Sequence, residues 1–404
     1  MIILVLNCGS SSLKYQVLDM KSANDFSLMA KGLVERIGMA EGDITHKPTG
    51  RDKVEIHKPI PDHTVGIKSV LDLLTDPVSG VLTSLSQIEA VGHRVAHGGE
   101  IFSESVRIDA DAIEKIGTLS ELAPLHNPAN LLGIKAVAAL MPDIPQVAVF
   151  DTSFHQTMPD YAYTYAIPYE FYEKYRIRRY GFHGTSHKYV AGRACEITGM
   201  DINNSRIITC HLGNGGSVTA ILNGKSVDTS MGFTPTDGVE MGTRCGCIDP
   251  GAVLYLQEKE GLDAAGTTAL LNKKSGFAGL SGISSDNRDI QAEADKGNSR
   301  AILTKEVFHY GVRKFIGAYS AAMGGVDMIV FTGGIGELFY IPLIIIFQKV
   351  IPLGVLGIDF DENANAGAHG EYAILTKPGS KVKVLMVSTN EELVIARDTM
   401  ALAR

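Results

Sequence analysis

A short polar segment near the start of the chain carries residue types that could hold a phosphate group. Gly9 permits a tight turn and a close approach of the backbone to a ligand. Ser10 and Ser12 offer hydroxyl groups, and Lys14 supplies a positive charge. Apolar runs flank the segment on both sides, as two strands require. The pattern predicts a phosphate cradle between two strands, with an ordinary hairpin as the alternative.

The same order of elements returns later in the chain. A strand pattern at 207–211 leads into the Gly/Ser-rich segment 212–217 and a second strand pattern at 218–222. A further glycine-rich turn, 332–336, follows another apolar run. Ligands of open α/β sheets bind beyond the carboxyl ends of the strands. The repetition therefore predicts a duplicated fold with a nucleotide between its halves, and the alternative is that the turns are connectors only.

Strand and helix patterns alternate along the whole sequence. The segments 89–94 and 145–150 are typical of buried strands that end in polar loops. The segments 130–140 and 300–323 have the apolar spacing of helices. Alternation of this kind indicates α/β architecture. A length of 404 residues favours two domains.

The composition excludes several classes of partner. The net charge of −8 gives no basis for binding nucleic acid or an anionic membrane surface. Five widely spread cysteines indicate a reducing compartment without a disulfide framework, and we expect a tight turn at Cys245–Cys247. The most apolar segment, 338–358, is interrupted by polar residues and prolines, so it does not predict a membrane span. With no signal peptide visible, we expect a cytoplasmic protein.

The segments 7–14, 211–217 and 331–336 together make the chain similar to the acetate kinase family. That family belongs to the superfamily of actin, hexokinase and the heat-shock chaperones. The likeness extends over nearly the whole chain, and further segments that carry it are 92–100, 124–130, 150–156, 179–187, 284–289 and 389–393.

The resemblance implies reversible, ATP-dependent phosphorylation of acetate to acetyl phosphate and ADP by direct in-line transfer with Mg²⁺, for which Mn²⁺ can substitute. It also implies a homodimer, and two duplicated actin-like ATPase (ribonuclease H-like) domains that flank a nucleotide cleft. The N-terminal domain would comprise residues 1–150 plus 390–404, so that the last helix packs back on it. The C-terminal, nucleotide-binding domain would comprise residues 151–389.

Two arginines fit the demands of this reaction. Acetate is already ionised at neutral pH, because a carboxylic acid titrates near ~4 to 5. The protein must therefore position two anions and neutralise oxygens more than it must remove a proton. A guanidinium can grip carboxylate or phosphoryl oxygens in a fixed fork, although a lone arginine can equally form a surface ion pair. By resemblance Arg94 binds the carboxylate and Arg244 stabilises the transferring phosphoryl group.

A histidine and an aspartate complete the predicted catalytic set. His183 lies among small residues, where an imidazole can donate a hydrogen bond to a developing charge, and the family assigns it transition-state stabilisation. Asp151 directly follows a buried strand, and similar proteins treat it as the catalytic acid/base. Because the substrate is already ionised, we favour a role for Asp151 in orienting Arg94 or, through water, Mg²⁺.

The remaining site residues follow from the resemblance. Asn7 and Glu391 match metal-site positions, and Glu391 also suits the first turn of a helix. The acetyl methyl group would contact Ala96, Leu125, Phe182 and Pro235. Nucleotide contacts would come from Lys14, His211, Leu212, Gly213, Asn214, Gly215, Asp286, Asn287, Arg288, Gly334, Ile335, Gly336, Glu337 and Leu338.

The chain departs from the family pattern at a few positions. Leu338 replaces an amide side chain, and the apolar segment after it is unlike the family's helix. Cys245 and Cys247 replace a serine and an aspartate, and the lost carboxylate could loosen Arg244. Many relatives have valine where Ala96 stands, and the smaller side chain opens room for propionate. We predict a working kinase with altered nucleotide affinity; the alternatives are a propionate or butyrate kinase, or a non-catalytic nucleotide-gated assembly protein.

Overall fold

The computed structural model describes residues 1–337 and 353–404. The chain forms two compact units, Met1–Ser153 with Asn390–Arg404, and Phe154–Thr389. The first unit ends at Ser153 rather than at Phe150, because the residues just after the strand remain bonded within it. Asp151 pairs with Arg94, and the hydroxyl of Thr152 accepts the N–H of Gly98. The predicted helical patterns at 130–140 and 300–323 and the strand patterns are all present in these units.

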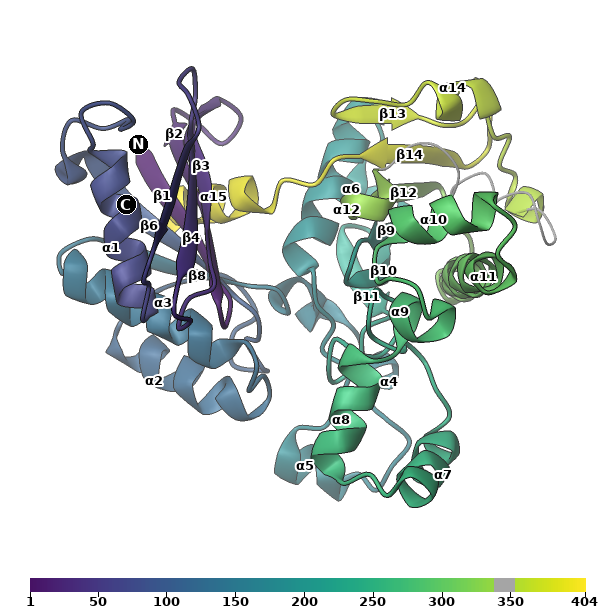
Figure 1. Cartoon of the computed structure of the whole chain (residues 1–404). Helices are drawn as coiled ribbons and strands as arrows, with labels where there is room; N and C mark the ends of the chain where they lie inside the picture. Colours follow the sequence, from purple (N-terminus) through teal and green to yellow (C-terminus); the bar gives the residue numbers. More distant parts are fainter. Residues whose placement is uncertain (338–352) are drawn as a thin grey trace. The chain divides into compact units, whose positions relative to one another are not determined.

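Unit 1 contains an eight-stranded sheet with its helices (Figure 1). Its strands are β1 (Ile2–Cys8), β2 (Ser12–Met20), β3 (Phe26–Glu35), β4 (Gly42–Pro48), β5 (Val54–Lys58), β6 (Ile88–Val95), β7 (Val106–Arg107) and β8 (Gln146–Phe150). Its α-helices are α1 (His63–Leu74), α2 (Ala110–Thr118), α3 (Asn127–Leu140) and α15 (Glu391–Leu402).

Unit 2 contains a six-stranded sheet. Its strands are β9 (Arg206–Leu212), β10 (Gly216–Leu222), β11 (Lys225–Thr229), β12 (Met328–Thr332), β13 (Tyr372–Ile374) and β14 (Lys383–Val387). Its described α-helices are α4 (Asp160–Tyr163), α5 (Glu170–Tyr175), α6 (Gly184–Thr198), α7 (Pro250–Glu260), α8 (Ala264–Lys273), α9 (Gly276–Ser281), α10 (Asn287–Asp295), α11 (Ser299–Ala322), α12 (Gly333–Gly336) and α14 (Glu362–Ala366).

The two sheets share a core topology. The strand order β3-β2-β1-β6-β8 in unit 1 corresponds to β11-β10-β9-β12-β14 in unit 2. In each set, the three strands of the double hairpin (β1 to β3, β9 to β11) pair antiparallel. The strands β6 and β12 pair in parallel with β1 and β9, and β8 and β14 pair in parallel with β6 and β12. The first hairpin of each sheet carries a predicted Gly/Ser turn, 9–11 in unit 1 and 213–215 in unit 2. The duplicated α/β fold predicted from the sequence is confirmed.

Helices cover both faces of the unit 1 sheet. Leu4 and Leu6 of β1 pack in a core cluster with residues of α1 and α3. On β6, Val91 joins that cluster, whereas a Cβ at the next residue, Gly92, would collide with Thr399 of α15. Because successive residues of a strand face opposite sides, α15 covers the other face of the sheet. Burial on both faces explains why β1 reads as an unbroken apolar run.

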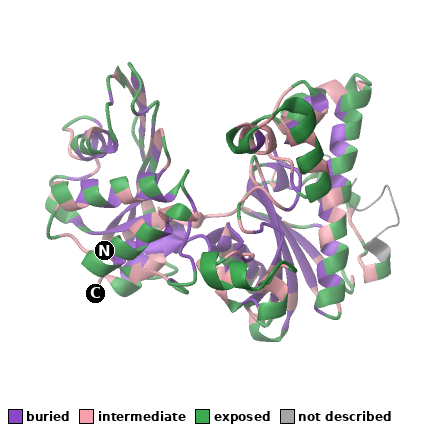
Figure 2. Cartoon of the chain, turned by 90° about the horizontal axis from the view of Figure 1, so that it is seen from below, coloured by how far each residue is buried: buried purple, intermediate pink, exposed green. Residues whose placement is uncertain are grey.

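The unit 2 sheet is covered in the same way (Figure 2). Ile208 of β9 packs in a cluster with α11, whereas the preceding residue, Ile207, packs with α6. The buried side of α11 follows the sheet along most of the helix, and its outer side is exposed. Both central strands β9 and β12 are therefore enclosed, and their carboxyl ends lead directly into polar turns.

No described helix has both the length and the apolar character that a membrane crossing needs, within residues 1–337 and 353–404. Most of the apolar segment discussed at 338–358, and the predicted nucleotide contact Leu338, lie outside the described residues.

Candidate active site

An arginine and an aspartate are joined at the carboxyl edge of the unit 1 sheet. Arg94 lies near the end of β6, and Asp151 directly follows β8, its parallel neighbour. Nε of Arg94 donates to Oδ1 of Asp151 at 2.9 Å, and Nη2 donates to Oδ2 at 2.5 Å. The Asp151 carboxylate is almost fully buried, and its charge raises the pKa of Arg94 above the ordinary value. The pair holds the guanidinium in one orientation with its charge intact.

Two further oxygen-bearing side chains lie beside this pair. Nη1 of Arg94 donates to Oδ1 of Asn7, which is on β1, at 3.3 Å. Glu391 begins α15, and burial raises its pKa to about 7, with Arg94 opposing the shift and Asp151 adding to it. A carboxylate that is buried near another carboxylate favours a cation. Amide and carboxylate oxygens are the ligands that Mg²⁺ prefers, so the donor set fits this ion.

A protein cage for a metal is not needed for such a site. Among residues 1–337 and 353–404, no group of three His, Cys, Asp or Glu side chains lies in a metal-binding arrangement. Mg²⁺ takes only one or two protein carboxylates and keeps several waters. Asn7 and Glu391 together supply ligands of this kind.

Buried amides fix the loop that follows Arg94. Asn130 of α3 accepts the N–H of Ala96 at 3.0 Å and donates to the carbonyl of Cys8 at 2.7 Å. Asn127 bonds both the N–H and the carbonyl of His97. The ends of β1 and β6 are therefore tied together through α3. Lys14 is exposed on β2 and pairs in register with Asn7, and its charge acts on Glu391.

In unit 2, the predicted catalytic histidine begins a helix. His183 occupies the residue before α6 with a left-handed backbone, φ +58°. A non-glycine residue in this conformation costs on the order of 1–3 kcal/mol, and such residues cluster at functional sites. Its Nδ1 lies 2.9 Å from Oγ of Ser217, and its ring stacks on His211 with centroids 4.3 Å apart. The sequence predicted a turn at His183, and the structure shows the helix starting one residue later.

The side chains of Arg244 and His183 both lie close to Gly215. A Cβ built on Gly215 would lie 3.4 Å from Nη1 of Arg244 and 3.5 Å from Cε1 of His183. Nη1 also donates to the carbonyl of Pro235 at 3.1 Å. Burial lowers the pKa of Arg244 below its ordinary value. The second glycine turn therefore lies against two donor side chains.

The sequence predicted that Cys245 and Cys247, in place of a serine and an aspartate, could loosen Arg244. The structure shows which bonds hold this loop. The thiol of Cys247 is 3.2 Å from Oδ1 of Asp237, and the backbone N–H of Cys247 bonds to the carbonyl of Gly238. Gly246 has a positive φ of +70°, a backbone conformation that glycine adopts readily. Arg244 is held by a backbone carbonyl and needs no carboxylate for that bond.

The predicted nucleotide segments of unit 2 converge on one edge of its sheet. A Cβ on Gly213 would lie 3.7 Å from the N–H of Gly334, so the second and third glycine turns are neighbours. The loop at Gly242 bonds to the carbonyl of Asn214, and a Cβ there would lie 3.1 Å from the carbonyl of Ser285. A Cβ on Gly334 would meet open space. Glycines at such an edge leave backbone N–H groups accessible to phosphate oxygens.

The other residues of this set have defined local roles. Glu337 accepts the N–H groups of Gly333 and Thr389, which ties the third turn to the end of β14. Asp286 caps α10 and pairs with Arg288 at 2.6 Å, and these bonds lower the pKa of Asp286 to about 2. The third turn forms the short helix α12 where the sequence predicted only a turn. Asn287 begins α10, Leu212 and Ile335 are buried, and Gly336 ends α12.

The predicted acyl-binding residues do not form one cluster within either unit. Ala96 is buried in unit 1, whereas Leu125 of the same unit is 62% exposed. Phe182 belongs to unit 2, where it packs with Met231 and Met241. Pro235 lies on the loop that holds Arg244.

Several residues with a part in the site were missed from the sequence. Ser217 and His187 form a hydrogen-bonded chain to His183, and Asn130 fixes the loop after Arg94. Ser217 closes the Gly/Ser-rich segment and Asn130 lies in a segment of family likeness, so both had a weak signal. Glu240 is buried with neither carboxylate oxygen bonded within residues 1–337 and 353–404, and burial raises its pKa to about 8. A lone glutamate in a loop gave no such signal.

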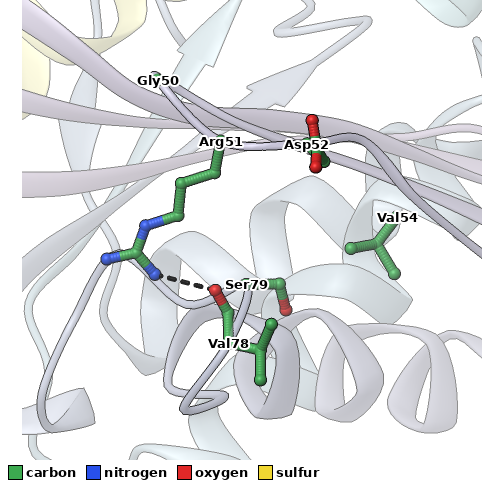
Figure 3. A pocket seen from close by; sticks show the side chains of 6 residues that line it. All are labelled: Gly50, Arg51, Asp52, Val54, Val78 and Ser79. Atoms are coloured by element: carbon green, nitrogen blue, oxygen red, sulfur yellow. Dashed lines mark hydrogen bonds between the residues drawn. The ribbon is translucent and has the colours of Figure 1, made fainter.

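A separate hollow lies on unit 1 away from these residues (Figure 3). Gly50, Arg51, Asp52, Val54, Val78 and Ser79 line it, and the Arg51 guanidinium donates to the carbonyl of Val78 at 3.1 Å. None of the predicted site residues lines this hollow.

Comparisons with known proteins agree with this arrangement. The sequence profile of the Acetokinase family matches residues 2–397. An acetate kinase of Caldanaerobacter subterraneus subsp. tengcongensis is 55% identical over 403 residues, covering 100% of this chain and 99% of the relative. The structure of Porphyromonas gingivalis acetate kinase is similar with a TM-score of 0.95 and 48% identity, covering 100% of both chains. A propionate kinase from Francisella tularensis is similar with a TM-score of 0.91 and 42% identity, covering 99% of both chains.

Proposed function

The chain belongs to the acetokinase family, and from this premise we propose that it transfers the γ-phosphoryl group of ATP to acetate, forming acetyl phosphate and ADP. The observation that carries the proposal is the approach of Arg244 and His183 to one point beside Gly215, in a unit whose glycine turns expose backbone donors. A transferring phosphoryl group needs donors aimed at its oxygens, and these side chains supply them.

We infer that Arg94 binds the acetate carboxylate and that Asp151 orients Arg94. Two edges of the guanidinium are engaged by Asp151 and Asn7, so the group cannot rotate away from its position. Both carboxylate oxygens of Asp151 accept hydrogen bonds from Arg94. Because acetate is ionised at neutral pH, the reaction requires an oriented Arg94 guanidinium and does not require a proton acceptor.

Arg244 and His183 stabilise the phosphoryl group as it transfers. The half-buried guanidinium of Arg244 is held by the Pro235 carbonyl through Nη1, and its other nitrogens can donate to phosphoryl oxygens. His183 adds a donor on the same side of Gly215. Preorganised donors of this kind typically contribute about 10²–10³ in kcat each.

Mg²⁺ would be held by Asn7 and Glu391, with Mn²⁺ as a substitute. When bound, the ion neutralises charge on the phosphate oxygens. Glu391 would bind it as a carboxylate, and the neighbouring charges of Arg94 and Asp151 act on that group.

The partners follow from the same proposal. ATP and ADP would contact Lys14 and the convergent segments of unit 2, so unit 2 is the nucleotide-binding domain and unit 1 is the N-terminal actin-like domain. We further propose that the protein is a cytoplasmic homodimer without nucleic-acid or membrane partners.

A trapping assay tests the proposal directly. With ATP, Mg²⁺ and acetate, hydroxylamine should capture acetyl phosphate as the hydroxamate, and EDTA should abolish the product until Mg²⁺ or Mn²⁺ is restored. Arg94→Ala should raise the KM for acetate, whereas Arg244→Ala should lower kcat. ATP binding without hydroxamate formation would contradict the kinase and favour a nucleotide-gated assembly protein.

Propionate is a second candidate substrate. A propionate kinase is among the structures that the chain resembles, and Ala96, two residues after Arg94, has a small side chain. Values of kcat/KM for acetate, propionate and butyrate rank the candidates, and acetate should have the highest.

A further inference from the structure

One serine in unit 2 lies between two imidazoles. Oγ of Ser217 is 2.9 Å from Nδ1 of His183 and 2.7 Å from Nε2 of His187. Ser217 is fully buried on β10. These nitrogens are the hydrogen-bond partners of the hydroxyl within residues 1–337 and 353–404, and a buried hydroxyl proton needs an acceptor, so Ser217 donates to one histidine and accepts from the other. The direction of this chain decides which nitrogen of His183 carries a proton.

The chain continues beyond His187. Its second nitrogen, Nδ1, lies 2.7 Å from Oγ1 of Thr209 on β9. His187 is fully buried, and burial lowers its pKa well below the ordinary value, with His155 and His211 acting in the same direction. His187 is therefore neutral, and it has one N–H for its two partners.

Only two proton orders connect these four groups. In the first, Thr209 donates to His187, the Nε2–H of His187 donates to Ser217, and Ser217 donates to Nδ1 of His183. In the second, every bond is reversed, and Nδ1–H of His183 donates to Ser217. An ionised His187 would still donate to Ser217 and so leave His183 as in the first order.

The hydroxyl of Thr209 decides between the two orders. In the second order Thr209 accepts from His187, and its own proton must find another acceptor. Thr209 is fully buried, and no other acceptor for its hydroxyl is present within residues 1–337 and 353–404. A buried donor left unsatisfied costs about 1–3 kcal/mol. In the first order every proton between Thr209 and Nδ1 of His183 has an acceptor.

We propose that Ser217 is a positioning residue that keeps His183 neutral with its proton on Nε2, through the bond order Thr209 to His187 to Ser217 to His183. Nε2 is the nitrogen on the Gly215 side, 3.6 Å from a Cβ built on that glycine, where Nη1 of Arg244 also approaches. Without this order a neutral His183 could present a lone pair to the phosphoryl oxygens instead of a donor. The kinetic part of this inference rests on the proposed phosphoryl transfer, and the tautomer does not.

The tautomer is measured on the wild-type protein without substrate. With ¹⁵N-labelled histidine, long-range ¹H–¹⁵N correlation spectra distinguish the Nε2–H tautomer, the Nδ1–H tautomer and the imidazolium ion. His183 is assigned by the signal that a His183→Asn variant lacks. At pH 7.5 we expect the Nε2–H tautomer. An Nδ1–H tautomer or an imidazolium ion at His183 would overturn the proposal, whatever the enzyme's activity.

Matched variants test the role of Ser217. Ser217→Ala should give a mixture of His183 tautomers and lower kcat by about 10- to 100-fold, with the KM for ATP and acetate little changed. Ser217→Thr keeps the hydroxyl and should restore both. Thr219→Val removes another buried hydroxyl of β10, which bonds to Thr229, and should leave the spectrum of His183 unchanged.

The outcomes separate the two proposals. If Ser217→Ala leaves both the tautomer and kcat unchanged, Ser217 does not position His183. If it changes the tautomer but not kcat, the catalytic part of the inference is wrong. A wild-type protein that shows the expected tautomer but forms no acetyl phosphate would contradict the proposed function and leave the proton order standing. If Ser217→Ala does not fold, the wild-type spectrum alone decides.

Discussion

The guanidinium of Arg94 meets the carboxylate of Asp151 edge to edge, with Nε 2.9 Å from Oδ1 and Nη2 2.5 Å from Oδ2. The two residues end neighbouring parallel strands, β6 and β8, so the sheet itself sets their separation. A fork held by two charge-assisted bonds presents its remaining donors in a fixed direction. If Arg94 binds acetate as proposed, the strength of that binding depends on Asp151, a residue that need not touch acetate.

Asp151→Asn tests this dependence. An amide accepts through only one of its two atoms, so Arg94 loses one of its two bonds and its partner charge. We expect kcat/KM for acetate to fall by about 30- to 100-fold while the KM for ATP changes by less than about threefold. Asp327→Asn is the control, because it breaks a similar pair with Arg206 at 2.7 Å that lies outside the site. Equal losses in both variants would contradict a specific role for Asp151.

Gly215→Ala tests the space between Arg244 and His183. The added methyl group would lie 3.4–3.5 Å from both side chains and would occupy the place proposed for phosphoryl oxygens. We expect kcat to fall by about 10- to 100-fold with little change in melting temperature. Gly311→Ala in α11, where a Cβ meets open space, should leave kcat unchanged and raise stability by roughly 0.5–1 kcal/mol. Full activity in Gly215→Ala would contradict the proposal that phosphoryl oxygens occupy the space between Arg244 and His183.

Glu240 makes stability depend on pH. Burial raises the pKa of its carboxyl to about 8, so the folded protein binds a proton that the unfolded chain releases near the ordinary value of 4.5. This contribution to stability is complete below about pH 4.5 and is lost as the pH rises toward 8. Glu240→Met should therefore stabilise unit 2 by about 3–5 kcal/mol at pH 8.5 and by much less at pH 5.

Calorimetry at the two pH values measures this effect as a shift of the unit 2 transition. Glu240→Gln serves as the control, because it keeps an unbonded polar group but cannot ionise. The stabilities of Glu240→Gln and Glu240→Met should differ by the same amount at both pH values. A wild-type protein whose melting temperature relative to Glu240→Met does not change with pH would contradict the shifted pKa.

Ala96→Val tests acyl chain length. Ala96 is buried, its N–H is held by Asn130, and it is proposed to contact the acyl group, so a larger side chain there should leave less room for that group. Two extra methyl groups remove room for about two carbons, each worth ~0.8 kcal/mol of burial. We expect kcat/KM for propionate to fall by about tenfold while the value for acetate changes by less than about threefold. A parallel loss for both acids would place the acyl group elsewhere.

The sequence was sufficient for the central strands and for the duplication of the fold, because β1 and β12 read as unbroken apolar runs that end in polar or glycine-rich segments. It also singled out Arg94 and Asp151, since both follow such runs. It left open whether Asp151 orients Arg94 or, through water, Mg²⁺, because a direct pair requires the register of β6 against β8, and that register joins residues 57 positions apart.

The hydroxyl groups around His183 show a second limit of prediction from the sequence. Ser217 and Thr209 look in the sequence like ordinary strand residues, and only the antiparallel pairing of β9 with β10 brings them to opposite nitrogens of His187. Likewise Glu240 is an ordinary charged residue in the sequence, and its unbonded carboxylate exists only because the loop buries it. Properties that depend on long-range packing are not encoded in local periodicity.

The position of α15 has a consequence for biosynthesis. The sheet of unit 1 precedes unit 2 in the chain, yet the helix that covers Gly92 on one of its faces begins at Glu391, so it is translated only after the whole of unit 2. Until then the nascent sheet carries an uncovered apolar surface, which a chaperone can bind. Truncation of the chain before Glu391 would leave this face of the sheet uncovered and would remove the glutamate proposed for the metal site.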